Sequence, residues 1–116
     1  MPESAADNSD PVLPSRLLTV LVVGGSGRHF ESLNSTYPES HQRTLQWACE
    51  LGSWLAGQPV NLLTGGGGGV MAAVSEGFHQ VNHRAGKVIG VLPGPQPPGG
   101  YPNPHVEIVI QTHLAG

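Results

Sequence analysis

Residues 59–71 read PVNLLTGGGGGVM, and the prediction of the fold starts from this stretch. Val60 to Thr64 is mostly apolar or β-branched, which favours a buried β-strand. Five consecutive glycines, Gly65 to Gly69, follow, and Val70-Met71 then opens a helix pattern. Glycine has no side chain to keep a ligand away from the backbone, and the first N–H groups of a helix carry partial positive charge. The order strand, glycine turn, helix therefore predicts a binding site for a phosphate or another anion.

Three more apolar runs have the length of strands. They are Leu17 to Val23, Lys87 to Leu92 and Val106 to Gln111. Two helix patterns, Glu39 to Gln58 and Val70 to His83, lie between the runs. This alternation predicts an α/β fold with a Rossmann-like, doubly wound parallel sheet of about four strands. The first run is apolar throughout, which predicts a strand buried on both faces in the middle of the sheet.

Three strand exits rich in glycine are expected to meet at one edge of this sheet, because ligands of parallel sheets bind outside the carboxyl ends of the strands. Ser26 offers a hydroxyl there, and Arg28 a guanidinium that reaches an anion. The candidate ligand-binding residues are Gly25, Ser26, Gly27, Arg28, Thr64, Gly65, Gly66, Gly67, Gly68, Gly69, Val70, Met71, Pro93 and Gly94.

Residues with obvious catalytic roles are not evident in the sequence. It contains neither a Walker A loop nor a Gly-x-Ser-x-Gly turn, and the first glycine loop does not fit the usual dinucleotide pattern. No pair of carboxylates falls at the expected strand exits, and Cys49 lies within a helix pattern. His79 and His83 have a spacing that suits a metal, but Gln80 stands where a hydrolytic zinc helix needs Glu. We therefore expect anion binding without catalytic residues or a metal.

Composition narrows the class of protein. The 116 residues allow one domain, with 11% charged residues and a formal net charge of −3. Five scattered Lys and Arg residues argue against nucleic acid and anionic membranes as partners. No apolar run reaches the roughly 18–20 residues that span a bilayer. With no secretory signal and a single cysteine, the expectation is a cytoplasmic protein, with residues 1–15 as a disordered leader and 16–116 as the domain.

The connecting segments carry further expectations. Residues 29–38 read as a long polar connection, and the Pro- and Gly-rich segment 93–104 as a lid or a surface loop. In the helix expected at 39–58, one apolar stripe is widened by Trp47, Leu51 and Trp54. So wide an apolar face predicts burial against the sheet, and a second subunit is a further candidate for covering it.

Three segments resemble one known family. Thr64-Gly65-Gly66, two residues, then Gly69-Val70-Met71 resembles the T-G-G-x-x-G-V-M turn of the LOG-like proteins, a family of SLOG type once called lysine decarboxylase-like. Ile89 to Gly94 matches a second family segment. Asn103 to Ile110 resembles the N-P-Y-V-D-I-V-I stretch of the branch that carries molybdenum cofactor. Cytokinin-activating phosphoribohydrolases belong to the same family.

The resemblance implies a Rossmann-like homo-oligomer that binds a nucleoside monophosphate or the phosphate of molybdenum cofactor. Ser26, Gly27 and the Gly65–Met71 turn would then contact phosphate or ribose. The family's second signature, P-G-G-x-G-T-x-x-E, carries its catalytic Glu and is absent here; residues 98–101 (PGGY) match only its first letters. Compared with the domain of the LOG-like proteins, the C-terminal part is expected to be missing.

Three functions stay open. The first, which we favour, is a non-catalytic, carrier-like protein for a phosphorylated nucleotide-type ligand or molybdenum cofactor. The second is a phosphoribohydrolase that acts on cytokinin riboside 5′-monophosphates, and the third is an inactive fragment that needs a partner.

Overall fold

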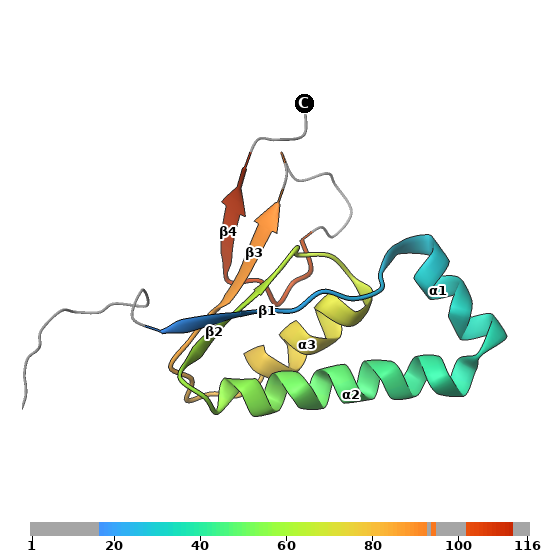
Figure 1. The fold of residues 1–116 in the computed structure, drawn as a ribbon, viewed down its shortest axis with the longest axis horizontal. Coiled ribbons are helices and arrows are strands. Elements are labelled where there is room, and N and C mark those ends of the chain that lie inside the picture. Colours follow the sequence, from blue (N-terminus) through green and yellow to red (C-terminus); the bar gives the residue numbers. More distant parts are fainter. Residues whose placement is uncertain (1–16, 93, 95–101, 113–116) are drawn as a thin grey trace, which may run out of the picture.

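The computed structural model describes residues 17–92, 94 and 102–112. The expected leader at 1–15, most of the segment 93–104 and residues 113–116 lie outside the described residues. The elements in chain order are β1 (Leu18–Leu21), α1 (Gly27–Thr36), α2 (Pro38–Ala56), β2 (Val60–Thr64), α3 (Gly69–His79), β3 (Val88–Leu92) and β4 (Ile108–Gln111) (Figure 1). All strand pairs are parallel, in the order β1-β2-β3-β4. The predicted α/β, Rossmann-like fold with four parallel strands is confirmed.

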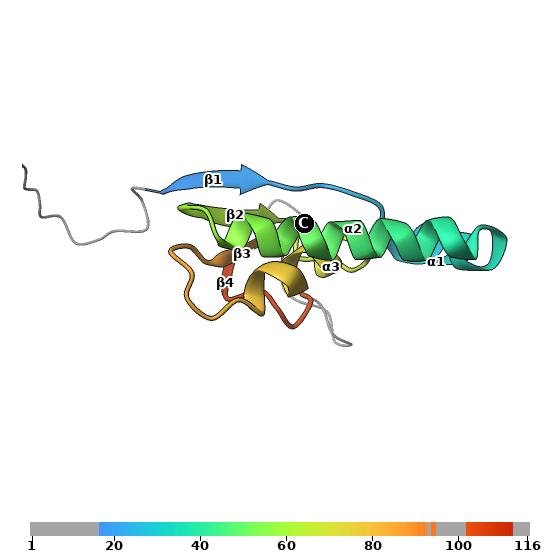
Figure 2. The ribbon, with the colours of Figure 1, turned by 90° about the horizontal axis from the view of Figure 1, so that it is seen from below.

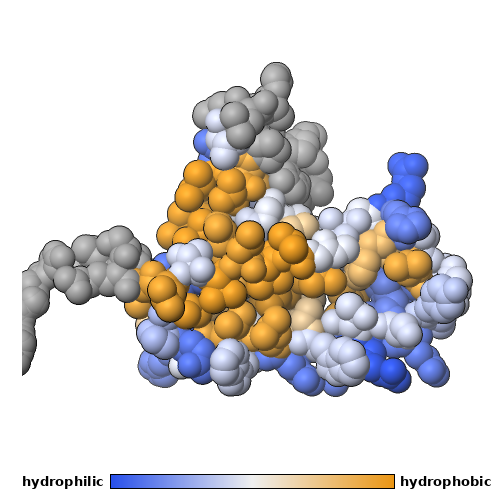
Figure 3. Space-filling model, viewed as in Figure 1, coloured by the Kyte–Doolittle hydropathy of each residue, from blue (hydrophilic) through white to orange (hydrophobic). Residues whose placement is uncertain are grey.

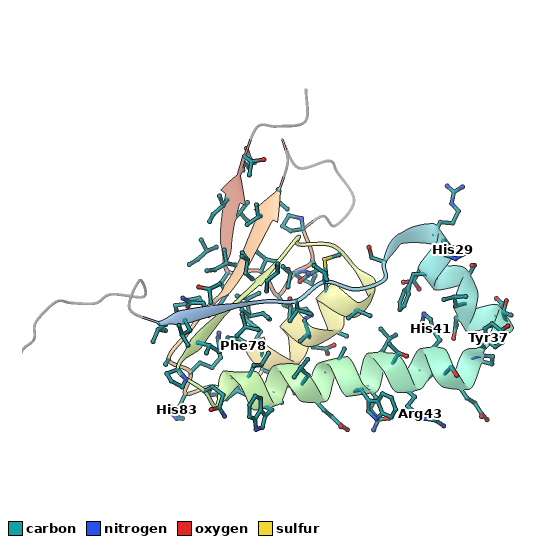
Figure 4. All side chains as sticks on the ribbon, viewed as in Figure 1. His29, Tyr37, His41, Arg43, Phe78 and His83 are labelled. Atoms are coloured by element: carbon teal, nitrogen blue, oxygen red, sulfur yellow. The ribbon has the colours of Figure 1, made fainter. Side chains whose placement is uncertain are left out.

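The core lies between the sheet and two helices, α2 and α3. Val20, Leu62 and Val88 are side by side in the sheet and point toward these helices. Val74 and Phe78 of α3 meet them and are completely buried, and Figure 4 shows Phe78 between its helix and the strands. The helix side of the core is completed by Ala48, Leu55 and Ala56 of α2.

Two glycines let α2 and α3 pack with their backbones in contact. A side chain on Gly52 would collide with the carbonyl oxygen of Val74, and one on Gly77 with the carbonyl oxygen of Cys49. Close packing of this kind places both helices on one face of the sheet, and in the view of Figure 2 they lie together there.

The other face of the sheet, which we call the open face, carries no helix among the described residues. One row across it joins Leu21, Leu63, Ile89 and Ile108 in register. Leu21 is 61% exposed, and Figure 3 shows an apolar surface extending over the strands. A doubly wound sheet has helices on both faces. Here the strands follow chain order, so right-handed crossovers keep the described helices on one side.

Two expectations from the sequence differ from the structure. β1 is an edge strand with Leu18 and Leu21 exposed, rather than a central strand buried on both faces. An apolar run reports the preference of a strand for burial but not which elements are present to cover it. Residues 29–36, expected as a connection, belong to α1, where Phe30 and Leu33 at i, i+3 form the apolar side of an otherwise polar helix.

The tryptophans of α2 also lie elsewhere than expected. Trp47 and Trp54 are each 63% exposed, and Leu51 is 45% exposed. Each of them immediately precedes Ala48, Gly52 or Leu55, which pack on the core, and therefore lies about 100° further round the helix, beyond the edge of the buried face. The expectation that Trp47, Leu51 and Trp54 widen the face against the sheet is therefore wrong.

An ion pair joins Arg84, in the segment between α3 and β3, to Glu107, the residue before β4. Arg84 donates two hydrogen bonds to the Glu107 carboxylate, at 2.7 and 3.2 Å, and the Val88 N–H donates a third at 2.9 Å. Burial raises the pKa of Glu107, but these bonds and the charges of Arg84 and Lys87 outweigh it and hold the pKa below its ordinary value. The charged carboxylate therefore stabilises the fold.

We expect Glu107→Gln to lower the free energy of unfolding at pH 7 by about 1–2 kcal/mol, since charge-assisted hydrogen bonds are lost. A lowered carboxyl pKa contributes stability that is present above the ordinary value near pH 4.5 and is lost as the pH falls through the lowered value. Urea unfolding between pH 3 and pH 7 measures both effects. Glu50→Gln on exposed α2 is the control, with an expected change under about 0.5 kcal/mol. An equal loss for both variants would contradict the role of this ion pair.

No helix in the part of the chain that the structure describes has both the length and the apolar character needed to cross a membrane.

Candidate functional site

The glycine turn, residues 65–69, joins β2 to α3 as the sequence predicts. Gly66 and Gly69 have φ of +79° and +60°, in the left-handed region that favours glycine. Gly68 is the N-cap of α3, and no acidic residue occupies the first turn of this helix. The positive end of α3 is therefore not neutralised by its own side chains.

Two buried polar side chains fix the shape of the glycine turn. The Thr64 hydroxyl oxygen accepts a hydrogen bond from the Gly66 N–H at 3.0 Å. Asn103, which is 6% exposed, donates from its backbone N–H to the Gly66 carbonyl and from its side-chain Nδ2 to the Gly67 carbonyl, both at 2.8 Å. The structure thus places the predicted residue Thr64 behind the turn as a support. Asn103, which the sequence analysis did not select, has the same role.

The first loop, residues 24–27, packs directly on the glycine turn. The Val70 N–H donates to the Gly25 carbonyl at 3.0 Å, and a side chain on Gly69 would collide with that carbonyl oxygen. The Ser26 hydroxyl lies 3.8 Å from the position that a Cβ on Gly67 would take. Two of the three predicted strand exits therefore meet.

This contact brings the N-termini of α1 and α3 together (Figure 1). Ser26 is the N-cap of α1 but makes no capping hydrogen bond through its side chain, and the first turn of α1 contains no acidic residue. Exposed Arg28 stands in that turn. Two helix N-termini, a hydroxyl and a guanidinium lie at one edge of the sheet, a combination that attracts an anion.

The third predicted exit contributes less. Pro93 lies outside the described residues, and Gly94 is buried. Leu92, the last residue of β3, lies close to Gly66, because a Cβ on Gly66 would be 2.8 Å from Leu92 Cδ2. The end of β3 therefore packs against the glycine turn at Gly66.

A cleft of about 550 Å³ adjoins the glycine turn at Gly69. Its polar side chains come from three helices and the segment before β4: Glu31, Gln42, Gln46, Cys49, Glu76 and His105. This cleft was not predicted from the sequence. The signal was present, since Gln42, Leu45, Gln46 and Cys49, and likewise Gly69, Ala72, Ala73 and Glu76, follow the i, i+3, i+4, i+7 spacing of one helix face.

The cleft and the edge of the sheet differ in charge. Glu31 and Glu76 make the cleft acidic, which suits hydroxyl or amino groups of a ligand and disfavours a phosphate.

Burial, followed by the charges of Glu76 and Glu50, raises the pKa of the Cys49 thiol, so this thiol is not an activated nucleophile. Among the described residues, no group of three or more His, Cys, Asp and Glu side chains is placed to hold a metal ion.

Comparison with known proteins identifies the family. The profile of the SLOG cluster4 family matches residues 17–115. The chain belongs to the SLOG cluster4 family. Among curated proteins, no sequence matches the chain.

One solved structure resembles this SLOG chain closely. It is the X-ray structure of TM1055, a target of the Northeast Structural Genomics Consortium, at 30% sequence identity and a TM-score of 0.63. The similarity covers 84% of this chain and 49% of TM1055. The chain thus spans about half the length of this neighbour.

Gly68→Asp tests the anion site without disturbing the backbone of the glycine turn. Gly68 has φ of −87°, and a Cβ there would meet nothing within 4 Å. Asp is a favourable N-cap, so we expect an unchanged or slightly higher melting temperature, but its carboxylate occupies the place of an anion beside α3. Titration calorimetry with inorganic phosphate should show at least about a tenfold loss of affinity. Gly68→Asn is the neutral control and should keep the affinity; equal affinity in both variants would place the anion elsewhere.

Proposed function

We propose that the chain binds a phosphorylated small molecule of nucleotide or pterin type and does so without catalysing a reaction. The observation that carries this proposal is the contact of Gly25 with Gly69 and Val70, because it brings two helix N-termini to one point. In this proposal the phosphate lies at that point, near Ser26 and Arg28. The polar remainder of the ligand extends into the cleft. Membership of the SLOG family supports a nucleotide-related role.

The arrangement of charge supports this orientation of the ligand. A phosphate is attracted to the helix N-termini and repelled by Glu31 and Glu76. Ribose hydroxyls and the amino groups of a purine or a pterin are hydrogen-bond donors, and carboxylates accept from them. Nucleoside monophosphates and molybdenum cofactor both combine such groups with a phosphate.

Phosphoribohydrolase activity is the second candidate. The cleft residues Glu31 and Glu76 favour it, because a carboxylate beside the bound ligand is able to act as a general base toward water. The family signature that contains the catalytic Glu is absent from residues 1–116.

Calorimetry with AMP, adenosine and molybdenum cofactor tests the binding role. We expect AMP to bind at least about tenfold more tightly than adenosine, because the phosphate supplies charge-assisted hydrogen bonds. Absence of heat with AMP and with molybdenum cofactor would contradict the proposal. In a parallel assay for released adenine, we expect no product from AMP. Release that is lost in Glu76→Gln but kept in the cleft variant Gln46→Ala would show the phosphoribohydrolase instead.

We also propose that two copies associate through the open face. Parallel sheets have both faces covered almost without exception, and in a single chain Leu21 and Val23 are 61% and 75% exposed. Large apolar patches of this kind mark interaction sites. An interface on the open face leaves the edge of the sheet that carries Ser26 and Gly68 accessible.

Sedimentation velocity tests this association. We expect a dimer for the unmodified chain and a monomer for Val23→Asp, because an unpaired carboxylate in an apolar interface is strongly unfavourable. The matched control is Trp54→Asp, which changes another exposed apolar side chain, on α2, and should leave the dimer intact. A monomeric unmodified chain, or dissociation only in Trp54→Asp, would show that the open face is not the interface.

A further inference from the structure

A second cavity, apart from the glycine turn and its cleft, lies between α1 and α2. Its volume is about 210 Å³, and its lining residues are Phe30, Leu33, Tyr37, Ser40, His41 and Thr44. The cavity is open to solvent on one side, since Tyr37, Ser40 and Thr44 are exposed. Figure 4 shows His41 rising from α2 toward α1, with Tyr37 at the junction of the two helices. Phe30 also packs on Gly25, so this cavity and the first loop share a wall.

His41 is the unusual side chain of this cavity. It is 7% exposed, and neither Nδ1 nor Nε2 has a hydrogen-bond partner in the part of the chain that the structure describes. Its ring packs against Phe30 with the centroids 4.7 Å apart. A neutral imidazole has one donor and one acceptor, and leaving both unused in a buried position costs free energy. A ligand in the cavity that bonds to either nitrogen recovers part of that cost.

The size and lining of the cavity define the class of ligand. An engineered cavity of about 150 Å³ in another protein holds benzene, so about 210 Å³ accommodates one aromatic ring with a small substituent. Phe30, Leu33 and Tyr37 provide apolar and aromatic walls. Apart from His41, no lining residue is acidic or basic, which favours a neutral molecule. The Thr44 hydroxyl already donates to the Ser40 carbonyl at 2.9 Å. Among the described lining residues, only His41 has buried polar atoms without a hydrogen-bond partner.

We propose that the cavity between α1 and α2 binds a neutral, single-ring aromatic molecule that carries a hydroxyl or amino group. The ring packs between Phe30 and Leu33, and the polar group forms a hydrogen bond with the His41 imidazole. This site is separate from the anion site, and its occupation does not depend on the function proposed for the glycine turn.

Phenol and toluene are the probes, because they share ring size and differ by one hydrogen-bonding group. Each is titrated into the full 116-residue chain, and binding is followed by NMR through the Leu33 methyl and Phe30 ring signals. A purely apolar cavity prefers toluene, since phenol loses its hydrogen bonds to water on entry. With His41 as partner, we expect saturable shifts with both probes and phenol to bind at least as tightly as toluene.

Two variants locate the effect. His41→Leu should shift the affinity ratio toward toluene by at least about tenfold, because the hydrogen bond is lost while the apolar walls remain. Thr44→Val is the matched control in the same cavity and should leave the ratio unchanged. The affinities of phenol and toluene for the unmodified chain are enough to test the proposal. A clear preference for toluene there, or no saturable shift at Leu33, would show that the cavity is only a packing defect or holds water.

Discussion

The hydrogen bond from the Val70 N–H to the Gly25 carbonyl is the contact on which the candidate site depends. It joins the loop after β1 to the first turn of the helix after β2, and it forms only because Gly69 has no side chain to displace that carbonyl. With this contact, two helices begin beside each other at one edge of the sheet. Their partial positive charges then act on the same volume, which one helix N-terminus alone does less strongly.

The frame behind this contact is built from small residues and buried amides. Gly52 and Gly77 allow α2 and α3 to touch, which sets the position of α3 relative to the sheet. Asn103 holds the carbonyls of Gly66 and Gly67 from the segment before β4. The first loop, Thr64 and Asn103 therefore hold the glycine turn in place, although its own residues have no side chains. In the proposed binding role, a turn held in place in this way has little ordering cost when an anion binds.

In the proposed binding role, the distribution of charge favours one orientation of the ligand. The edge of the sheet has helix N-termini and Arg28, whereas the adjoining cleft has Glu31 and Glu76. A molecule with a phosphate at one end and hydrogen-bond donors at the other satisfies both regions, and the reverse orientation places the phosphate beside carboxylates. The open face, in contrast, has only aliphatic side chains along its central row and suits association rather than ligand binding.

The local elements and the chemistry of the glycine turn can be predicted from the sequence. Four strands, the helices α2 and α3 and the glycine turn follow from apolar periodicity and from five consecutive glycines, all of which act over short distances along the chain. The buried face of α2 is known only from the packing of the helices, because Trp47 and Trp54 fit an apolar stripe as well as Leu55 does. The tertiary structure also places Glu31 and Glu76 in one cleft and Asn103 against the glycine turn. Each of these contacts joins residues far apart in sequence, and the relative placement of helices depends on packing between elements that no local pattern records.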